Sequence, residues 1–277
     1  MGFQTLVVEK EEHIGTLMFN RPETLNAISH TMIEEFPLAV RDLNEDNDIR
    51  VVIVTGTGRG FCSGMDVKQG FSTLQELRER YPAGDALPLL QGAGHLEAMG
   101  MRLGDMQKPT IAAVNGPAID GGLDLAMACD FRIASEKATF SERYNMLANN
   151  PDIGGSYRLA RLVGVAKAKA LTFFADIIDA EEALRIGLVN KVVPHDELTD
   201  VVGDMAARLA TYSPIALACC KFLIDRNQDC DYLTAIEREM LVARYLHRTT
   251  DPYEGIAAFR EKREPKYVSK LLGHEQG

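Results

Sequence analysis

Two short glycine-bearing segments carry the backbone groups best suited to chemistry in this sequence. Phe61–Asp66 (FCSGMD) follows one continuous apolar run, and Gly116–Asp124 (GPAIDGGLD) follows another. Glycine permits unusual backbone dihedral angles and lets a ligand approach N–H groups closely. The second segment leads into an expected helix, whose first N–H groups lack intrahelical acceptors and carry partial positive charge. One N–H group from each segment would form an oxyanion hole, which stabilises negative charge on a carbonyl oxygen.

The two segments follow runs that are typical of buried strands. Val51–Thr55 and Thr110–Asn115 are apolar without alternation, as in a parallel sheet covered on both faces. Helical spacing of apolar residues predicts a helix over Ser29–Asn44, with Ser29 as N-cap and a kink at Pro37. Further strands are expected over Met1–Lys10, His13–Asn20, Phe131–Ala134 and Leu188–Val193. Further helices are expected over Gly92–Met106, Leu123–Cys129, Ala166–Gly187, Asp196–Ala210, from Pro214 onward and over Tyr253–Lys262.

The composition fits one large globular domain. The chain has 277 residues, 46% hydrophobic and 25% charged, with a formal net charge of −10. This charge argues against a nucleic-acid partner, although a local cluster of lysine and arginine would still hold an anionic ligand. Five cysteines without CxxC spacing argue against disulfides and structural zinc. The sequence shows neither an apolar run of membrane-spanning length nor a signal-peptide pattern, so we expect a cytoplasmic protein.

Strands and helices alternate over the first two-thirds of the chain, and the last third is mostly helical, which predicts an α/β core with a helical tail. Six segments of the chain, in the same order along the sequence, resemble the crotonase (enoyl-CoA hydratase/isomerase) superfamily. They are NRPETLNAIS (20–29), VVIVTGTGRGFCSGMDVKQ (51–69), KPTIAAVNGPAIDGGLDLAMACDFRIAS (108–135), PDIGGSYRLARLVG (151–164), residues 180–194 and AFREKREPKY (258–267). The resemblance covers nearly the whole chain.

This resemblance implies a fold, a substrate class and an assembly. It implies an α/β crotonase (ClpP-like) fold, with repeated ββα units over residues 1–195 as the acyl-CoA-binding catalytic core and a helical trimerisation region over residues 196–277. It implies a small-molecule acyl-CoA substrate, a homotrimer or homohexamer, and no metal or cofactor other than coenzyme A as part of the substrate. By position, the N–H groups of Met65 and Gly121 would hold the thioester oxygen and favour the enolate.

The acid–base positions depart from the hydratase pattern. Where hydratases of the superfamily carry two glutamates, this chain has Asp124 and Tyr144. Asp152 stands at the second place of PDIGG, as an aspartate does in dienoyl-CoA isomerases and in 4-chlorobenzoyl-CoA dehalogenase, where it is the nucleophile. A carboxylate beside the acyl chain would move a proton between carbons or attack an electrophilic carbon. Burial would raise its pKa toward the working range.

Each of these side chains also has a purely structural interpretation. Asp152 would cap a turn, Asp124 would favour the first turn of a helix, and Tyr144 would form a pocket wall rather than donate a proton. Glu142, beside Arg143, is expected to form a surface ion pair. Taken singly, glycine-bearing segments of this kind are more often turns that only pack, because glycine turns are common.

The phosphates of coenzyme A would meet lysine and arginine side chains. By resemblance, the candidates for CoA binding lie in the loops around the site and in the C-terminal helix: Arg21, Cys62, Asp66, Lys68 and Lys262. Glu23 stands where relatives often have lysine, which weakens a phosphate clamp there. Residues 70–100 are expected to shape the acyl pocket. Their apolar candidates for its walls are Phe71, Leu74, Leu77, Tyr81, Leu87, Leu89 and Leu90.

Three functions are open at this point. The first is isomerisation or hydration of an unsaturated acyl-CoA, cyclic and dienoyl groups included, in which Asp152 acts with the oxyanion hole while Asp124 and Tyr144 assist. The second is hydrolysis or dehalogenation, in which Asp152 attacks carbon. The third is acyl-CoA binding without catalysis, which the replacement of both glutamates would allow.

Overall fold

A six-stranded sheet forms the centre of the computed structural model, which describes residues 2–68 and 96–272. The strand order is β1-β2-β3-β4-β6-β9, with β1 and β2 antiparallel and all other neighbours parallel. The bounds are β1 Leu6–Glu11, β2 Ile14–Phe19, β3 Val51–Gly56, β4 Thr110–Val114, β6 Phe131–Ser135 and β9 Lys191–Val193. A smaller sheet joins β5 (Ala118–Ile119), β7 (Thr139–Ser141) and β8 (Ile178–Asp179). The expected α/β class is confirmed.

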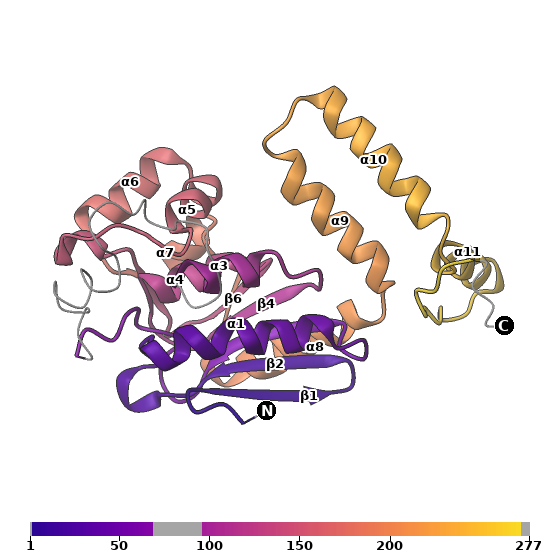
Figure 1. Cartoon of the computed structure of the whole chain (residues 1–277). Coiled ribbons are helices and arrows are strands. Elements are labelled where there is room, and N and C mark those ends of the chain that lie inside the picture. Colours follow the sequence, from indigo (N-terminus) through magenta and orange to yellow (C-terminus); the bar gives the residue numbers. More distant parts are fainter. Residues whose placement is uncertain (1, 69–95, 273–277) are drawn as a thin grey trace, which may run out of the picture.

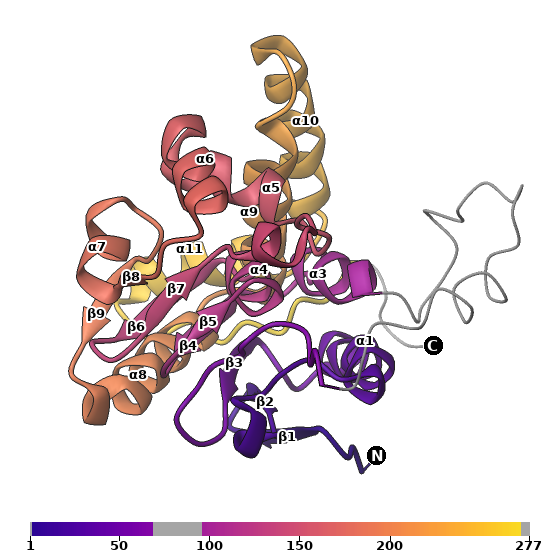
Figure 2. The ribbon, with the colours of Figure 1, turned by 90° about the vertical axis from the view of Figure 1, so that its left-hand side faces the viewer.

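Helices cover both faces of the main sheet (Figures 1 and 2). α1 (His30–Glu45), α3 (Leu96–Gly104) and α4 (Gly121–Ala128) share one hydrophobic core with Val52 and Val54 of β3. α8 (Leu198–Ala210) shares a second core with Val51 of β3 and Ile111 of β4. Successive strand residues point to opposite faces, so these strands are apolar throughout because both faces are buried.

Local sequence signals explain the helix that begins this layer. The Ser29 hydroxyl accepts a hydrogen bond from the Met32 N–H at 3.1 Å and so caps α1, as predicted. α1 continues through Pro37 as one helix, and its buried face contains Phe36, Val40 and further apolar residues. The amphipathic spacing thus holds although proline removes one backbone donor.

The segment after the pocket is more broken than the sequence suggests. The single helix predicted over residues 166–187 is wrong: α6 (Val165–Phe174) ends where Ala175 adopts a left-handed conformation with φ of 57°. The chain then forms β8 and restarts as α7 (Ala180–Arg185), which Asp179 caps. Before them comes α5 (Gly155–Val163), and short 3-10 helices span Pro22–Thr24, Tyr144–Leu147 and His195–Glu197.

The last three helices form an arm that extends away from the sheet (Figure 1). They are α9 (Pro214–Asn227), α10 (Tyr232–Leu246) and α11 (Asp251–Glu261). Neither α9 nor α10 buries any residue, whereas α8, which precedes them, packs on the sheet. Asp251 ties the arm together, because its carboxylate accepts hydrogen bonds from the hydroxyls of Ser213 at 2.6 Å and Ser269 at 2.7 Å.

None of the described helices is, by itself, long and apolar enough to cross a membrane. The bent pair His195–Ala210 and Pro214–Asn227 meets the length and composition criteria only when its two helices are combined. The cytoplasmic location expected from the sequence stays a prediction.

Candidate active site

The two glycine-bearing segments lie side by side, because they follow the neighbouring parallel strands β3 and β4. Cys62 and Ala118 form a parallel bridge. The N–H groups of Phe61 and Cys62 donate to the Pro117 carbonyl at 3.1 and 3.0 Å, and the Ile119 N–H donates to the Cys62 carbonyl at 3.0 Å. The carboxyl ends of two parallel strands thus carry one connected backbone platform, at the edge where α/β sheets bind ligands.

The N–H groups of Met65 and Gly121 point away from the hydrogen bonds that hold this platform. Ile28 donates to the Gly64 carbonyl at 2.8 Å and accepts from the Asp66 N–H at 3.0 Å, so the Met65 N–H faces the other way. Gly121 is the first residue of α4, and its N–H has no acceptor within the helix. Neither group donates to an acceptor in the described part of the chain.

The first two residues of α4, Gly121 and Gly122, have no room for a side chain. A Cβ atom on Gly122 would lie 2.0 Å from the carbonyl oxygen of Cys62, and one on Gly121 would lie 2.8 Å from the Ile153 side chain. The Tyr144 hydroxyl lies 3.8 Å from the position of that second Cβ atom. The start of α4 therefore packs directly on the first segment, and the Tyr144 hydroxyl lies beside Gly121.

Asp120, just before α4, is a candidate functional residue that the sequence reasoning missed. Its φ of 50° and ψ of −121° are values that glycine adopts far more readily than aspartate, and such strain is common at functional sites. Its carboxylate accepts a short hydrogen bond from the Arg143 N–H, and burial raises its pKa. The available signal was the segment Asp120-Gly121-Gly122, in which aspartate replaces the first of three usual glycines.

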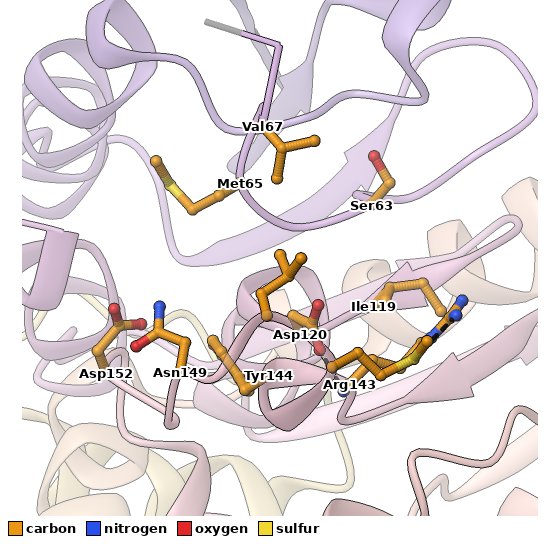
Figure 3. A pocket seen from close by; sticks show the side chains of 11 residues that line it. Ser63, Met65, Val67, Ile119, Asp120, Arg143, Tyr144, Asn149 and Asp152 are labelled. Atoms are coloured by element: carbon orange, nitrogen blue, oxygen red, sulfur yellow. Dashed lines mark hydrogen bonds between the residues drawn. The ribbon is translucent and has the colours of Figure 1, made fainter. Parts of the chain in front are cut away.

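A pocket of about 280 Å³ opens between the two segments (Figure 3). Met65 and Val67 lie on one side of it, and Asp120, Tyr144 and Asp152 lie on the other. The remaining described lining residues are Ser63, Ile119, Arg143, Met146, Leu147 and Asn149. The lining is mostly apolar with a few polar groups, which is typical of a small-molecule site.

Asp152 and Tyr144, both predicted from the sequence, line this pocket together. Asp152 is an exposed residue at the pocket, but partial desolvation of its carboxyl group by the pocket walls, followed by the nearby carboxylates of Glu97 and Asp120, raises its pKa to about 6. A carboxyl group with such a pKa exchanges protons readily near neutral pH. A pocket position and a raised pKa are the properties expected of an acid–base residue, so Asp152 stays a candidate for that role.

Asp124, the third predicted acid–base residue, lies behind the pocket rather than in it. It is fully buried in α4 and accepts a hydrogen bond from the Tyr144 hydroxyl at 2.8 Å. Burial raises the Asp124 pKa to about 6, and the hydrogen bond from Tyr144 partly offsets that rise. Burial and the neighbouring carboxyl groups raise the pKa of Tyr144, so its hydroxyl keeps its proton. Asp124 contacts the pocket through Tyr144.

Glu142 does not form the surface ion pair that we expected. Its side chain is 0% exposed, and it forms no ion pair with a described cation, Arg143 included. Burial, then the charge of Asp124, raises its pKa well above the ordinary value for glutamate. The expectation was wrong because Glu142 follows β7, which is enclosed between β5 and β8, and its side chain reaches the buried Asp124.

Three of the predicted CoA-binding residues form the base of the first segment. Arg21 donates to the Asp66 carboxylate at 2.8 Å and to the Ala27 carbonyl at 2.7 Å, and only 14% of its side chain is exposed. The Cys62 thiol is fully buried, and burial raises its pKa to about 12. These side chains position the backbone of the segment, and their CoA-binding role stays a prediction.

The other two candidates are exposed and lie far apart. Lys68 follows Val67 at the pocket rim, whereas Lys262 ends α11 at the far end of the arm (Figure 1). The apolar side chains predicted to shape the acyl pocket, from Phe71 to Leu90, lie outside the described residues. Within the described ranges, no group of three or more His, Cys, Asp or Glu side chains is arranged to hold a metal ion. The expected lack of a metal or separate cofactor stays a prediction.

Two outward-facing N–H groups beside a tuned carboxyl group define a candidate site for stabilising an oxyanion during proton transfer. The chain belongs to the enoyl-CoA hydratase/isomerase family, whose model matches residues 9–270. The superfamily predicted from the six segments is therefore confirmed.

Relatives match the chain over almost its full length. A crotonyl-CoA hydratase from Syntrophomonas wolfei is 38% identical, with 98% of this chain and 100% of that protein covered. A short-chain-enoyl-CoA hydratase from Clostridium acetobutylicum is 36% identical, with 95% and 97% covered. The crystal structure of an enoyl-CoA hydratase from Bacillus anthracis has a TM-score of 0.87 and 33% identity, with 96% of this chain and 100% of that chain covered. This agreement confirms the crotonase fold.

The contact at Gly122 gives the first prediction. Gly122→Ala would force a Cβ atom against the Cys62 carbonyl, and overpacking of this kind costs about 1–3 kcal/mol. We expect the thermal unfolding midpoint to fall by roughly 5 °C. The matched control is Gly203→Ala in α8, where a Cβ atom meets nothing within 4 Å and alanine favours the helix. Equal midpoints for the two variants would show that the segments are not in tight contact.

Proposed function

We propose that the protein isomerises or hydrates an unsaturated acyl-CoA thioester through an enolate held by the N–H groups of Met65 and Gly121. The observation that carries the proposal is Asp152, whose carboxyl group lines the pocket and has its pKa raised to about 6. A base whose pKa is near the working pH both accepts and returns a proton efficiently. The printed activities of the relatives, crotonyl-CoA and short-chain-enoyl-CoA hydration, support an unsaturated acyl-CoA as substrate.

Within this class, we favour movement of a double bond over addition of water. Hydration would need a pair of carboxylates to hold the water, and Tyr144 stands at one of the two positions. The Tyr144 hydroxyl is engaged with Asp124, which is itself absent from the described lining of the pocket. Asp152 is then the base best placed to act on the acyl chain.

In the proposed reaction, the thioester oxygen accepts hydrogen bonds from Met65 and Gly121. Asp152 removes a proton from an acyl carbon, and the electron pair of that C–H bond moves into the conjugated chain, so that negative charge develops on the thioester oxygen. Asp152 then returns the proton to another carbon, and the double bond has moved without gain or loss of atoms. The two N–H donors bind the enolate oxygen more strongly than the neutral carbonyl, which lowers the barrier.

The first functional prediction concerns Asp152→Asn, which removes the base but keeps the shape of the side chain. We expect kcat to fall by about 10²–10⁴-fold, the usual contribution of a general base. The measurement follows mass and absorbance of straight-chain, cyclic and dienoyl-CoA esters in deuterated water. Wild-type protein should incorporate deuterium and move a double bond without adding water, and Asp152→Asn should do neither.

The matched control is Asp196→Asn, at an exposed position outside the pocket, which should keep full activity. Net addition of water by the wild type would favour hydration over isomerisation. A covalent adduct on Asp152 after incubation with halogenated aromatic CoA esters would favour the nucleophilic reaction. Full activity of Asp152→Asn would contradict the assigned base, and binding of the esters without turnover would favour a non-catalytic acyl-CoA-binding protein.

The pKa of Asp152 predicts how activity depends on pH. A base must be ionised to accept a proton, so kcat/KM should be constant above neutral pH and fall about tenfold per unit once the pH drops below about 6. The measurement is the initial rate between pH 4.5 and 8, with circular dichroism to verify that the protein stays folded. A profile that is flat through pH 5 would contradict a base with this pKa.

The same pKa gives the sign of a stability effect. The folded protein holds the Asp152 proton up to about pH 6, whereas the unfolded chain releases it near the ordinary value of 3.8. Stability therefore falls as the pH rises through this window, and Asp152→Asn should be more stable than the wild type at pH 7. Lost activity with gained stability would distinguish a removed base from a damaged fold.

The arm is proposed to pack against further copies of this chain, as a homotrimer or homohexamer. Its helices expose large apolar side chains that a monomer would leave in water, among them Leu233 on α10, which is 72% exposed, and Phe259 on α11, which is 85% exposed. The others include Phe222, Ile224, Tyr232, Met240, Leu241, Tyr245, Tyr253 and Ile256. Apolar surface of this extent is typical of an interface between subunits. Lys262 would then approach the CoA of a neighbouring copy.

The assembly gives a further prediction. Light scattering after size-exclusion chromatography should give three or six times the chain mass of 30.5 kDa. The double variant Leu233→Glu and Phe259→Glu should dissociate into smaller species, because burying two charges in an apolar interface is costly. The control Glu45→Gln, at an exposed position of α1 outside the arm, should not change the mass. A wild-type monomer at micromolar concentration would rule out this interface.

A further inference from the structure

Glu142 is a buried carboxyl group without an evident donor. Its side chain is 0% exposed, and both carboxyl oxygens lack a hydrogen-bond donor among the described residues. An isolated carboxylate in such a place is very unfavourable, because burial removes its hydration. A group of this kind is retained either with a hidden partner or in its neutral, protonated form.

The neighbouring Asp124 has one oxygen in the same situation. Its Oδ2 accepts the Tyr144 hydroxyl at 2.8 Å, whereas its Oδ1 has no donor in the described part of the chain. Oδ1 lies directly against Gly155, because a Cβ atom built on Gly155 would be only 1.8 Å from it. The position therefore holds glycine, which has no side chain to donate a hydrogen bond to Oδ1. The side chains of Glu142 and Asp124 are within hydrogen-bonding reach of each other.

The other charged groups around this pair do not supply the missing donor. Asp120 and Asp152 act on Glu142 as further negative charges. Arg158 acts on Asp124 by its charge, but its guanidinium donates to the carbonyl oxygens of Ile153 at 3.1 Å and Gly100 at 3.0 Å. A single proton between the two carboxyl groups would complete their hydrogen bonding without any other donor.

We propose that Glu142 is a positioning residue: a neutral carboxylic acid that donates its proton to Asp124, so that Asp124 stays ionised and fixes the Tyr144 hydroxyl beside Gly121. The proton lies on Glu142 because the hydrogen bond that Tyr144 donates stabilises the ionised form of Asp124 more than its neutral form. This role of Glu142 belongs to the proposed active site, and only its kinetic test depends on the proposed function. The hydrogen bond is charge-assisted and therefore among the stronger ones in a protein interior.

The electrostatics of the pair agree with this geometry. Burial and the charge of Asp124 raise the pKa of Glu142 well above its ordinary value, which favours its neutral form. The hydrogen bonds from Tyr144 and Glu142 counteract the effect of burial on Asp124, whose pKa is about 6. The consequence for the pocket is that the Tyr144 proton points to Asp124, and the Tyr144 oxygen faces the pocket as an acceptor.

The test without substrate compares wild type and Glu142→Gln, which keeps a donor but cannot titrate. In the wild type, unfolding lets Glu142 ionise above its ordinary pKa of 4.5, so stability falls as the pH rises. The unfolding midpoint of Glu142→Gln, relative to wild type, should therefore rise steadily from pH 4.5 to pH 8. A relative midpoint that stays constant or falls over this range would show that Glu142 is ionised in the folded protein and would overturn the proposal.

The kinetic test uses Glu142→Leu, which removes the donor. The rate should fall about tenfold, because Asp124 loses a bond that favours its ionised form. Protonation of Asp124 should then add a second fall in activity, about one pH unit above the acid limb that Asp152 sets. Glu142→Gln should restore most of the rate and the original limb. Ser141→Ala changes the neighbouring residue at the end of β7, whose hydroxyl donates to the Asp176 carbonyl, and it should lose stability without a shift of the limb. A limb that moves equally in Ser141→Ala, or no rescue by Gln, would indicate a merely structural Glu142.

The two tests separate the inference from the proposed function. If no ester is turned over, the proposed function fails while the stability comparison still decides the protonation state of Glu142. If turnover is found but the stability of Glu142→Gln follows the opposite pH trend, the function stands and the role of Glu142 is rejected.

Discussion

The candidate site depends on a contact between two pieces of backbone that leaves no room for a side chain. The start of α4 lies on the carbonyl of Cys62 so closely that even a methyl group at Gly122 would overlap it. Because backbone is on both sides, rotation of a side chain cannot relieve such an overlap. The contact brings together the ends of β3 and β4, and so it determines where the N–H groups of Met65 and Gly121 lie. The strained conformation of Asp120 is part of the same turn.

A second constraint is the concentration of acidic groups beside this platform. Asp120, Asp124, Glu142 and Asp152 all have raised pKa values, chiefly through burial. Each raised pKa means that the folded protein is less stable at neutral pH than it would be with a neutral side chain there. Such a cost is typical of a functional site, where groups are held in unfavourable surroundings because chemistry needs them. The acidic groups in and behind the pocket thus lower the folding stability at neutral pH.

Local patterns in the sequence were sufficient for some features and uninformative for others. The strands before the two glycine-bearing segments, the cap at Ser29 and the pocket position of Asp152 follow from composition, capping chemistry and resemblance. The burial of Glu142 could not be predicted, because it arises from the pairing of β7 with β5 and β8, which are distant in sequence. The same pairing explains why the helix predicted over residues 166–187 is interrupted at β8. Non-local strand pairing thus overrides the local helical spacing at β8 and buries a charged side chain directly after β7.

The residue types at positions 142 and 144 depend on each other, because both side chains interact with Asp124. A glutamate at 144, as in hydratases that the sequence resembles, would add a carboxylate beside Asp124 and Glu142, and repulsion between like charges would force protonation. Tyrosine instead brings a neutral hydroxyl that donates to Asp124 at 2.8 Å. The second carboxyl group lies behind Asp124, at Glu142, away from the substrate. This exchange leaves Asp152 and Asp120 as the described carboxyl groups that line the pocket, and the proposed proton transfer on carbon rests on that arrangement.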